Sequence, residues 1–229
     1  SNCYLVCILC IFPSQSYNVF ISRCFSCKLI QNLICFFRRN HIAVGAGQNV
    51  VIDLNGHKWT NASKVIDLAD GTIYVYDSSS AKTGTISATG DDTINIQSGN
   101  ATFKDITVYG AVDSADGIFI LGGNVTVENC TVSSGKAGIN VDNRNGNAVL
   151  NVIGGTFADY TDSKDSTGRN CAIELRNNAS NITLSGDITF ENNVIICKYV
   201  FPSKTLKEMP SMLFSALKIC LKGLNYVHK

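Results

Sequence analysis

Proline is scarce in this chain of 229 residues, which contains 3 Pro, 2 Met and 1 Trp. So little proline excludes a Pro-rich chain, and a hydrophobic share of 45% excludes a disordered one. Long apolar runs are also lacking, because the longest near-continuous stretch, 4–12, is about half of the roughly 20 residues that span a bilayer. We therefore expect no transmembrane segment. The length suits one large domain or two small ones with a buried core.

The net charge is only +1, but charge is distributed unevenly along the chain. Residues 1–44 carry 4 basic and no acidic side chains, 45–193 carry 9 and 17, and 194–229 carry 6 and 1. Six of the 10 cysteines lie in the first of these segments, whereas 18 of the 19 glycines lie in the second. These coincident shifts predict domain boundaries near residues 45 and 193.

The two flanks show little periodicity. The Cys- and Phe-rich flank 1–44 is interpreted as the remnant of a secretory signal or as a non-native segment. Two Cys-x-x-Cys pairs within it, Cys7 with Cys10 and Cys24 with Cys27, match a four-thiolate zinc pattern. The residues between the two cysteines of each pair lack the turn residues that are typical of a zinc knuckle. In the flank 194–229, apolar residues at helical spacing from Met212 to Leu221 indicate a short amphipathic helix, which would cover a core end or lie on a membrane surface.

The middle segment repeats a phrase of three short parts, each of which alternates apolar and polar residues. The first parts are 65–68, 93–96, 117–120, 138–141 and 172–175. The second parts are 72–75, 101–104, 125–128, 148–151 and 182–185, and the third parts are 84–86, 106–108, 130–132, 155–157 and 188–190. Period-2 alternation bounded by Gly, Asn, Asp or Ser predicts that each part is a strand.

Three strands in each repeat of 20 to 30 residues predict a parallel β-solenoid, in which successive coils stack about 4.8 Å apart. A single coil has about five inward apolar side chains, and their burial cannot offset the entropy of ordering more than 20 residues. Coils are therefore stable only when they are stacked. The third parts place threonines in one outward column that suits such stacking: Thr85, Thr107, Thr131, Thr156 and Thr189.

The segments 51–57, 77–80 with 84–86, and 124–132 resemble the right-handed parallel β-helix repeats of the pectin-lyase-like superfamily, especially those of bacterial surface and secreted proteins. This resemblance extends over about 145 residues, from Asn49 to Asn193. It implies an all-β, right-handed parallel β-helix with three sheets and about five coils. It does not imply one activity, because the superfamily includes lyases, hydrolases, phage tailspikes and adhesins.

The first parts of the repeat would present one outward column on the solenoid. In β-helix proteins that this chain resembles, a sugar chain often lies along such a face. An aromatic ring between two amides could stack on a sugar while the amides bond its hydroxyls, and the alternative is a polar solvated face. The predicted carbohydrate-binding column is Asp67, Asn95, Phe119, Asn140 and Glu174.

A second hypothesis is catalytic. The stretch that contains Asp91 and Asp92 is similar to the Gly-Asp-Asp stretch of polygalacturonases, and Asp116 aligns with Asp92 one coil away. Such a pair could supply the acid and the base of glycoside hydrolysis. In those enzymes, however, the stretch with a single Asp precedes the Gly-Asp-Asp stretch, whereas here Asp116 follows Asp91 and Asp92. Their Gly-His-Gly and Arg-x-Lys stretches have no counterpart in this chain.

A pectate-lyase activity would need carboxylates that bind Ca²⁺ and a basic residue that abstracts a proton. The acidic middle segment disfavours it, because its basic residues align with acids on neighbouring coils: Arg176 with Asp142, and Lys104 with Glu128. We expect ion pairs at these positions.

The sequence therefore favours a non-catalytic structural, adhesive or glycan-binding module of a secreted or cell-surface bacterial protein. The alternative is a polysaccharide hydrolase or lyase that acts through Asp92 and Asp116 with Asp91 in support. No cofactor is expected. The expected partner is a polysaccharide or a cell-surface glycan, and the solenoid shows no basic patch for nucleic acid.

Overall fold

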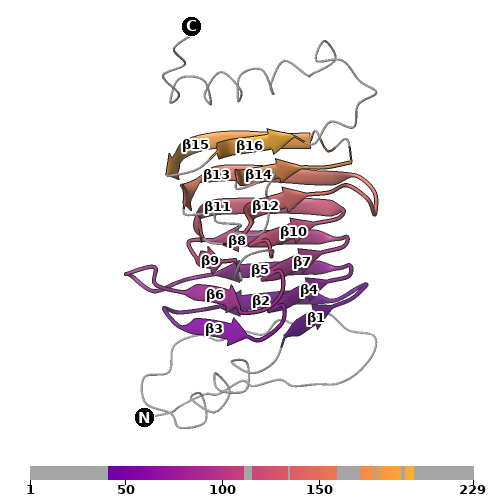
Figure 1. Cartoon of the computed structure of the whole chain (residues 1–229). Helices are drawn as coiled ribbons and strands as arrows, with labels where there is room; N and C mark the ends of the chain where they lie inside the picture. Colours follow the sequence, from indigo (N-terminus) through magenta and orange to yellow (C-terminus); the bar gives the residue numbers. More distant parts are fainter. Residues whose placement is uncertain are drawn as a thin grey trace, which may run out of the picture.

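A computed structural model describes residues 41–110, 115–133, 135–158, 171–177, 179 and 181–191, together with the backbone of 194–198. These residues form an all-β parallel solenoid of about four turns, in which the strands stack from β1–β3 at one end to β15 and β16 at the other (Figure 1). The repeat length predicted the solenoid correctly, although the expected number of coils was about five.

The first strand of each coil joins one seven-stranded parallel sheet. In stacking order these strands are β1 (Ile42–Val44), β4 (Ile66–Leu68), β7 (Ile94–Ile96), β10 (Ile118–Ile120), β12 (Ala137–Val141), β14 (Cys171–Leu175) and β16 (Val194–Lys198). β1 begins before residue 45 and β16 follows residue 193, so this sheet extends past both ends of the predicted repeat.

The second and third strands are separate in the early coils. The second strands are β2 (Asn49–Asp53), β5 (Thr72–Tyr76) and β8 (Asn100–Lys104), and the third strands are β3 (Lys58–Asn61), β6 (Thr85–Ala88) and β9 (Thr107–Tyr109). In later coils they merge into the 11-residue strands β11 (Gly123–Ser133), β13 (Ala148–Ala158) and β15 (Asn181–Glu191).

The described residues therefore form two sheets and not the expected three, because β11 pairs with β8 through its first half and with β9 through its second half. Within β11 the chain turns at Asn129, whose φ is 51°. A corner made by one left-handed residue lets hydrogen bonding continue on both sides of the bend.

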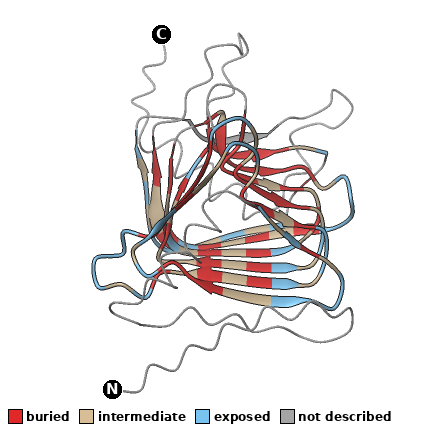
Figure 2. Cartoon of the chain, turned by 90° about the horizontal axis from the view of Figure 1, so that it is seen from below, coloured by how far each residue is buried: buried red, intermediate tan, exposed pale blue. Residues whose placement is uncertain are grey.

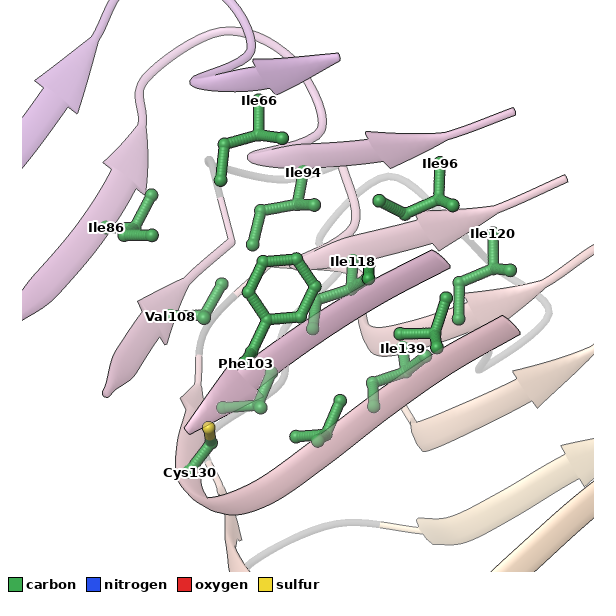
Figure 3. Close-up of a cluster of buried hydrophobic side chains, with 14 of the residues drawn as sticks. Ile66, Ile86, Ile94, Ile96, Phe103, Val108, Ile118, Ile120, Cys130 and Ile139 are labelled. Atoms are coloured by element: carbon green, nitrogen blue, oxygen red, sulfur yellow. The ribbon is translucent and has the colours of Figure 1, made fainter. Parts of the chain in front are cut away.

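The core is the interior of the coils, as Figure 2 shows in a view along the stack. Isoleucines occupy the same position on successive first strands: Ile66 pairs with Ile94, Ile94 with Ile118, and Ile118 with Ile139. All four are fully buried, and Figure 3 shows them with Phe103 and Val108 from the other walls. The alternation of the sequence thus assigned inward and outward positions correctly.

The described residues contain no helix, and in particular none that is long and apolar enough to cross a membrane. The helix predicted near Met212 to Leu221 lies outside the described residues. The same is true of the four cysteines of the zinc pattern.

Candidate functional site

The stacking assembles the predicted carbohydrate-binding column. Asp67 pairs with Asn95, Asn95 with Phe119, Phe119 with Asn140, and Asn140 with Glu174, all on the outer side of the first-strand sheet. Since every pairing is in register, the five side chains lie on adjacent strands as the repeat spacing predicted. We call this surface the first-strand face.

The first-strand face is largely buried. Asn95 is 7% exposed, Asn140 is 1% exposed and Glu174 is fully buried, whereas Asp67 and Phe119 are half-buried. An outward position in the strand pattern therefore does not make these residues accessible. A glycan could reach Phe119 and Asp67 more readily than the two asparagines between which Phe119 lies.

Polar contacts within this face connect neighbouring coils. The amide nitrogen Nδ2 of Asn95 and the Nε2 of Gln97 both donate to Oδ1 of Asp67, at 2.9 and 3.1 Å. At the far end, the Nε of Arg176 donates to Glu174 at 2.8 Å, and the Nζ of Lys136 lies 3.7 Å from the same carboxylate. These bonds compensate the buried charge of Glu174.

The ion pairs expected from the alignment are partly formed. Lys104 pairs with Glu128 at 2.6 Å across two coils, as predicted. Arg176 bonds Glu174 of its own coil rather than Asp142, because residues two apart on an outward face lie side by side. Asp142 is bonded instead by Arg144 and by the amide of Asn177.

The candidate catalytic aspartates do lie together. Asp92 accepts a hydrogen bond from the backbone N–H of Asp116 at 2.7 Å, and Asp116 accepts one from Nδ2 of Asn140 at 2.6 Å. Asp91 lies beside them, where it accepts hydrogen bonds from the backbone N–H of Asp92 and from the hydroxyl of Ser63. Each of the three aspartates is thus hydrogen-bonded to a residue of an adjacent coil.

Burial sets the protonation of this aspartate pair. It raises the pKa of Asp116 to about 7, with Asp92 and Glu174 adding to the rise and Lys136 opposing it. Burial also raises the pKa of Asp92, with a smaller rise from Asp91, although the N–H of Asp116 lowers it. The two carboxyls therefore differ in proton affinity, which is the property that an acid and base pair requires. Asp116, however, is only 4% exposed.

Three buried oxygen atoms in this region have no hydrogen-bond partner: Oδ1 of Asn95, Oδ1 of Asp116 and Oδ1 of Asn140. A proton on Asp116 would turn one of these acceptors into a donor. Below its pKa of about 7, Asp116 is neutral and its Oδ1 can carry the proton, whereas the Oδ1 atoms of Asn95 and Asn140 remain acceptors.

Phe119 lies under a charged side chain. The guanidinium carbon of Arg144 lies 5.8 Å from the centre of the Phe119 ring, within cation–π range. Arg144 is itself bonded to the buried carboxylate of Asp142. This arrangement covers part of the ring that was predicted to stack on a sugar.

The described part of the chain contains no group of three or more His, Cys, Asp or Glu side chains that could hold a metal ion. Cys130 and Cys171 are both buried, and burial raises the pKa of Cys130 to about 12. A thiol with such a pKa is protonated and unreactive at neutral pH.

The sequence reasoning missed an aromatic pair on another surface. Tyr74 and Tyr76 lie two residues apart on β5, and their rings are 5.0 Å apart between centroids and inclined by 15°. The signal was available, because Tyr74 and Tyr76 alternate with the inward Ile73 and Val75 and therefore occupy outward positions of the strand.

Comparison of the chain with models of protein families finds no match. Comparisons with curated proteins and with solved structures find none either.

Proposed function

We propose that this chain is a non-catalytic, glycan-binding module of a secreted or cell-surface bacterial protein, built as a right-handed parallel β-helix of the pectin-lyase-like kind. The observation that carries the proposal is the outer surface of the second strands. There, in-register pairing places Asn100 beside Asn124 and Thr102 beside Thr126, so amide and hydroxyl groups recur at the strand spacing of about 4.8 Å. Such rows suit a long ligand with many hydroxyl groups.

The use of the two aspartates supports the non-catalytic part of the proposal. Asp92 caps the N–H of Asp116 on the next coil, and Asp116 bonds Asn140 on the coil after that. Both acids thus stabilise the stack. A general acid must reach the glycosidic oxygen of its substrate, and a side chain that is 4% exposed does not meet this requirement in the present conformation.

Hydrolysis is the second candidate, and one observation favours it. Asp116, whose pKa is about 7, stands next to Asp92, which accepts a backbone hydrogen bond, so near neutral pH a partly protonated carboxyl lies beside a second carboxyl. This state would suit a retaining or inverting glycosidase once substrate gained access.

The test pairs a glycan array with a reducing-sugar assay on the full chain, using Asp92→Asn and Asp116→Asn as variants. We expect glycan binding without sugar release, and binding that both variants retain. Sugar release that both variants abolish would overturn the proposal in favour of hydrolysis. Absence of binding to any glycan would overturn the binding function itself.

A further inference from the structure

The second strands present an outer surface that differs from the first-strand face in its exposure. We call it the second-strand face, formed by the outward residues of β2, β5 and β8 and of the first halves of β11, β13 and β15. Its first row includes the exposed Thr72, Asn100 and Asn124, followed by the half-buried Val149 and the exposed Asn181. The Nδ2 of Asn124 donates to Oδ1 of Asn100 at 3.0 Å, so these two exposed amides are joined across adjacent coils.

The tyrosine pair lies in the two neighbouring rows of this face. Tyr74 pairs with Thr102 of the next strand, and Tyr76 with Lys104. Both tyrosines are half-buried and their stacked rings are nearly parallel, so an aromatic ridge lies beside the hydroxyl row of Thr102 and Thr126. Burial and the carboxylate of Asp53 raise the pKa of Tyr76, so its phenol keeps the proton that it would donate to a ligand.

The charges of the second-strand face are compensated within it. Lys104 and Glu128 form an ion pair of 2.6 Å. The remaining charged group, Asp53, is buried, and its Oδ1 accepts the N–H groups of Asn55 and Ser78. No cation is left to attract a polyanion, and a ligand without charge encounters the smallest desolvation cost.

We propose that Tyr74 and Tyr76, with the amide and hydroxyl rows beside them, form the binding site for a neutral polysaccharide that lies along the stacking axis. Apolar faces of its sugar rings pack on the tyrosines, and its hydroxyls bond Thr102 and the Asn100–Asn124 row. The rows run along the axis because they connect equivalent positions of stacked strands. The assignment rests on the proposed function and specifies both its site and its ligand class.

The test is affinity electrophoresis of the full chain in gels that contain a soluble neutral glucan, a soluble mannan or polygalacturonate. We expect retardation by at least one neutral polymer and none by polygalacturonate. Tyr74→Ala and Tyr76→Ala should each weaken binding about tenfold, whereas Tyr74→Phe should stay close to the parent chain because it keeps the ring. Tyr109→Ala is the matched control, since Tyr109 is 41% exposed on a third strand.

Two results would overturn this site while leaving the proposed function intact. One is undiminished binding in both tyrosine-to-alanine variants together with loss of binding in Phe119→Ala, which would place the glycan on the first-strand face. The other is retardation by polygalacturonate alone. Failure of all polymers to retard the chain would contradict both the site and the function. Circular dichroism of each variant separates lost binding from lost folding.

Discussion

At the scale of single residues, Asp77 shows how a buried carboxylate shapes this solenoid. Asp77 is 1% exposed, and its Oδ1 accepts the N–H groups of Gly56 and Ser79 while its Oδ2 accepts that of Gly84. It therefore joins two successive coils at the loop that precedes β6. Burial raises the pKa of this carboxyl, but the hydrogen bonds outweigh burial and the net shift is downward.

We predict that Asp77→Asn lowers the free energy of unfolding by about 3 kcal/mol. The amide has a single acceptor oxygen, so the N–H groups that now bond the other carboxylate oxygen would face an NH2 group. Thermal unfolding of the full chain measures this loss, with Asp70→Asn at an exposed position as control. The contribution of Asp77 is present above its unfolded-state pKa of about 3.9 and is lost as the pH falls through the lower folded-state value. An unchanged melting temperature at pH 7 would contradict this role.

The contribution of Asp116 to the free energy of unfolding depends on pH in the opposite direction. Burial raises its pKa to about 7, so between about pH 4 and pH 7 the folded state holds a proton that the unfolded state releases. Its contribution to the free energy of unfolding therefore falls as the pH rises through this window.

We predict that Asp116→Asn gains stability relative to the parent chain as the pH rises from 4 to 7, by up to about 4 kcal/mol. Urea unfolding at several pH values measures the difference between the two proteins. A difference that does not depend on pH would show that Asp116 is ionised throughout.

At the scale of elements, the turns between first and second strands carry a column of glycines. Gly71, Gly99 and Gly123 all have φ between 81° and 84°, in the left-handed region. A Cβ on Gly99 would lie 2.4 Å from the carbonyl oxygen of Gly71, and one on Gly123 would lie 2.4 Å from that of Gly99. The close approach of successive turns, and not only their backbone conformation, therefore requires glycine.

We predict that Gly99→Ala lowers the free energy of unfolding by about 3 kcal/mol, whereas Gly47→Ala lowers it by about 1 kcal/mol. Gly47 is a matched control, because its φ is 73° but a Cβ there would meet nothing within 4 Å. Chemical denaturation measures both. Equal losses in the two variants would mean that the stacked turns tolerate a methyl group.

Strand identity and register could be predicted from the sequence, because period-2 alternation fixes inward and outward positions. The threonine column is an example: Thr85 pairs with Thr107, and Thr107 with Thr131. The merging of second and third strands could not be predicted, since it depends on single corner residues such as Asn129. The burial of Asn95 and Asn140 was equally hidden, because alternation assigns a residue to a face but does not say how accessible that face is.

At the scale of the whole molecule, the coils share one continuous hydrophobic core. The central Ile118 is fully buried and pairs with Ile94 on one side and Ile139 on the other. A coil cannot be stable alone, so damage to a central coil removes support from both of its neighbours.

We predict that Ile118→Asp lowers the free energy of unfolding by about 4 kcal/mol or more, in one transition for the entire solenoid, because it buries an unpaired charge. The outward Thr107→Asp should cost much less, since that position is half-buried. Circular dichroism and tryptophan fluorescence of Trp59 in β3 should report the same midpoint. Separate midpoints would show that the coils unfold independently.

The most direct test of the glycan site is hydroxyl-radical footprinting of the full chain with and without the neutral polysaccharide that retards it. We predict that bound polysaccharide slows oxidation of Tyr74 and Tyr76 and leaves that of Tyr109, on a third strand, unchanged. Unchanged oxidation of Tyr74 and Tyr76 at saturating polysaccharide, with protection confined to Phe119, would contradict the claim that the second-strand face binds the glycan.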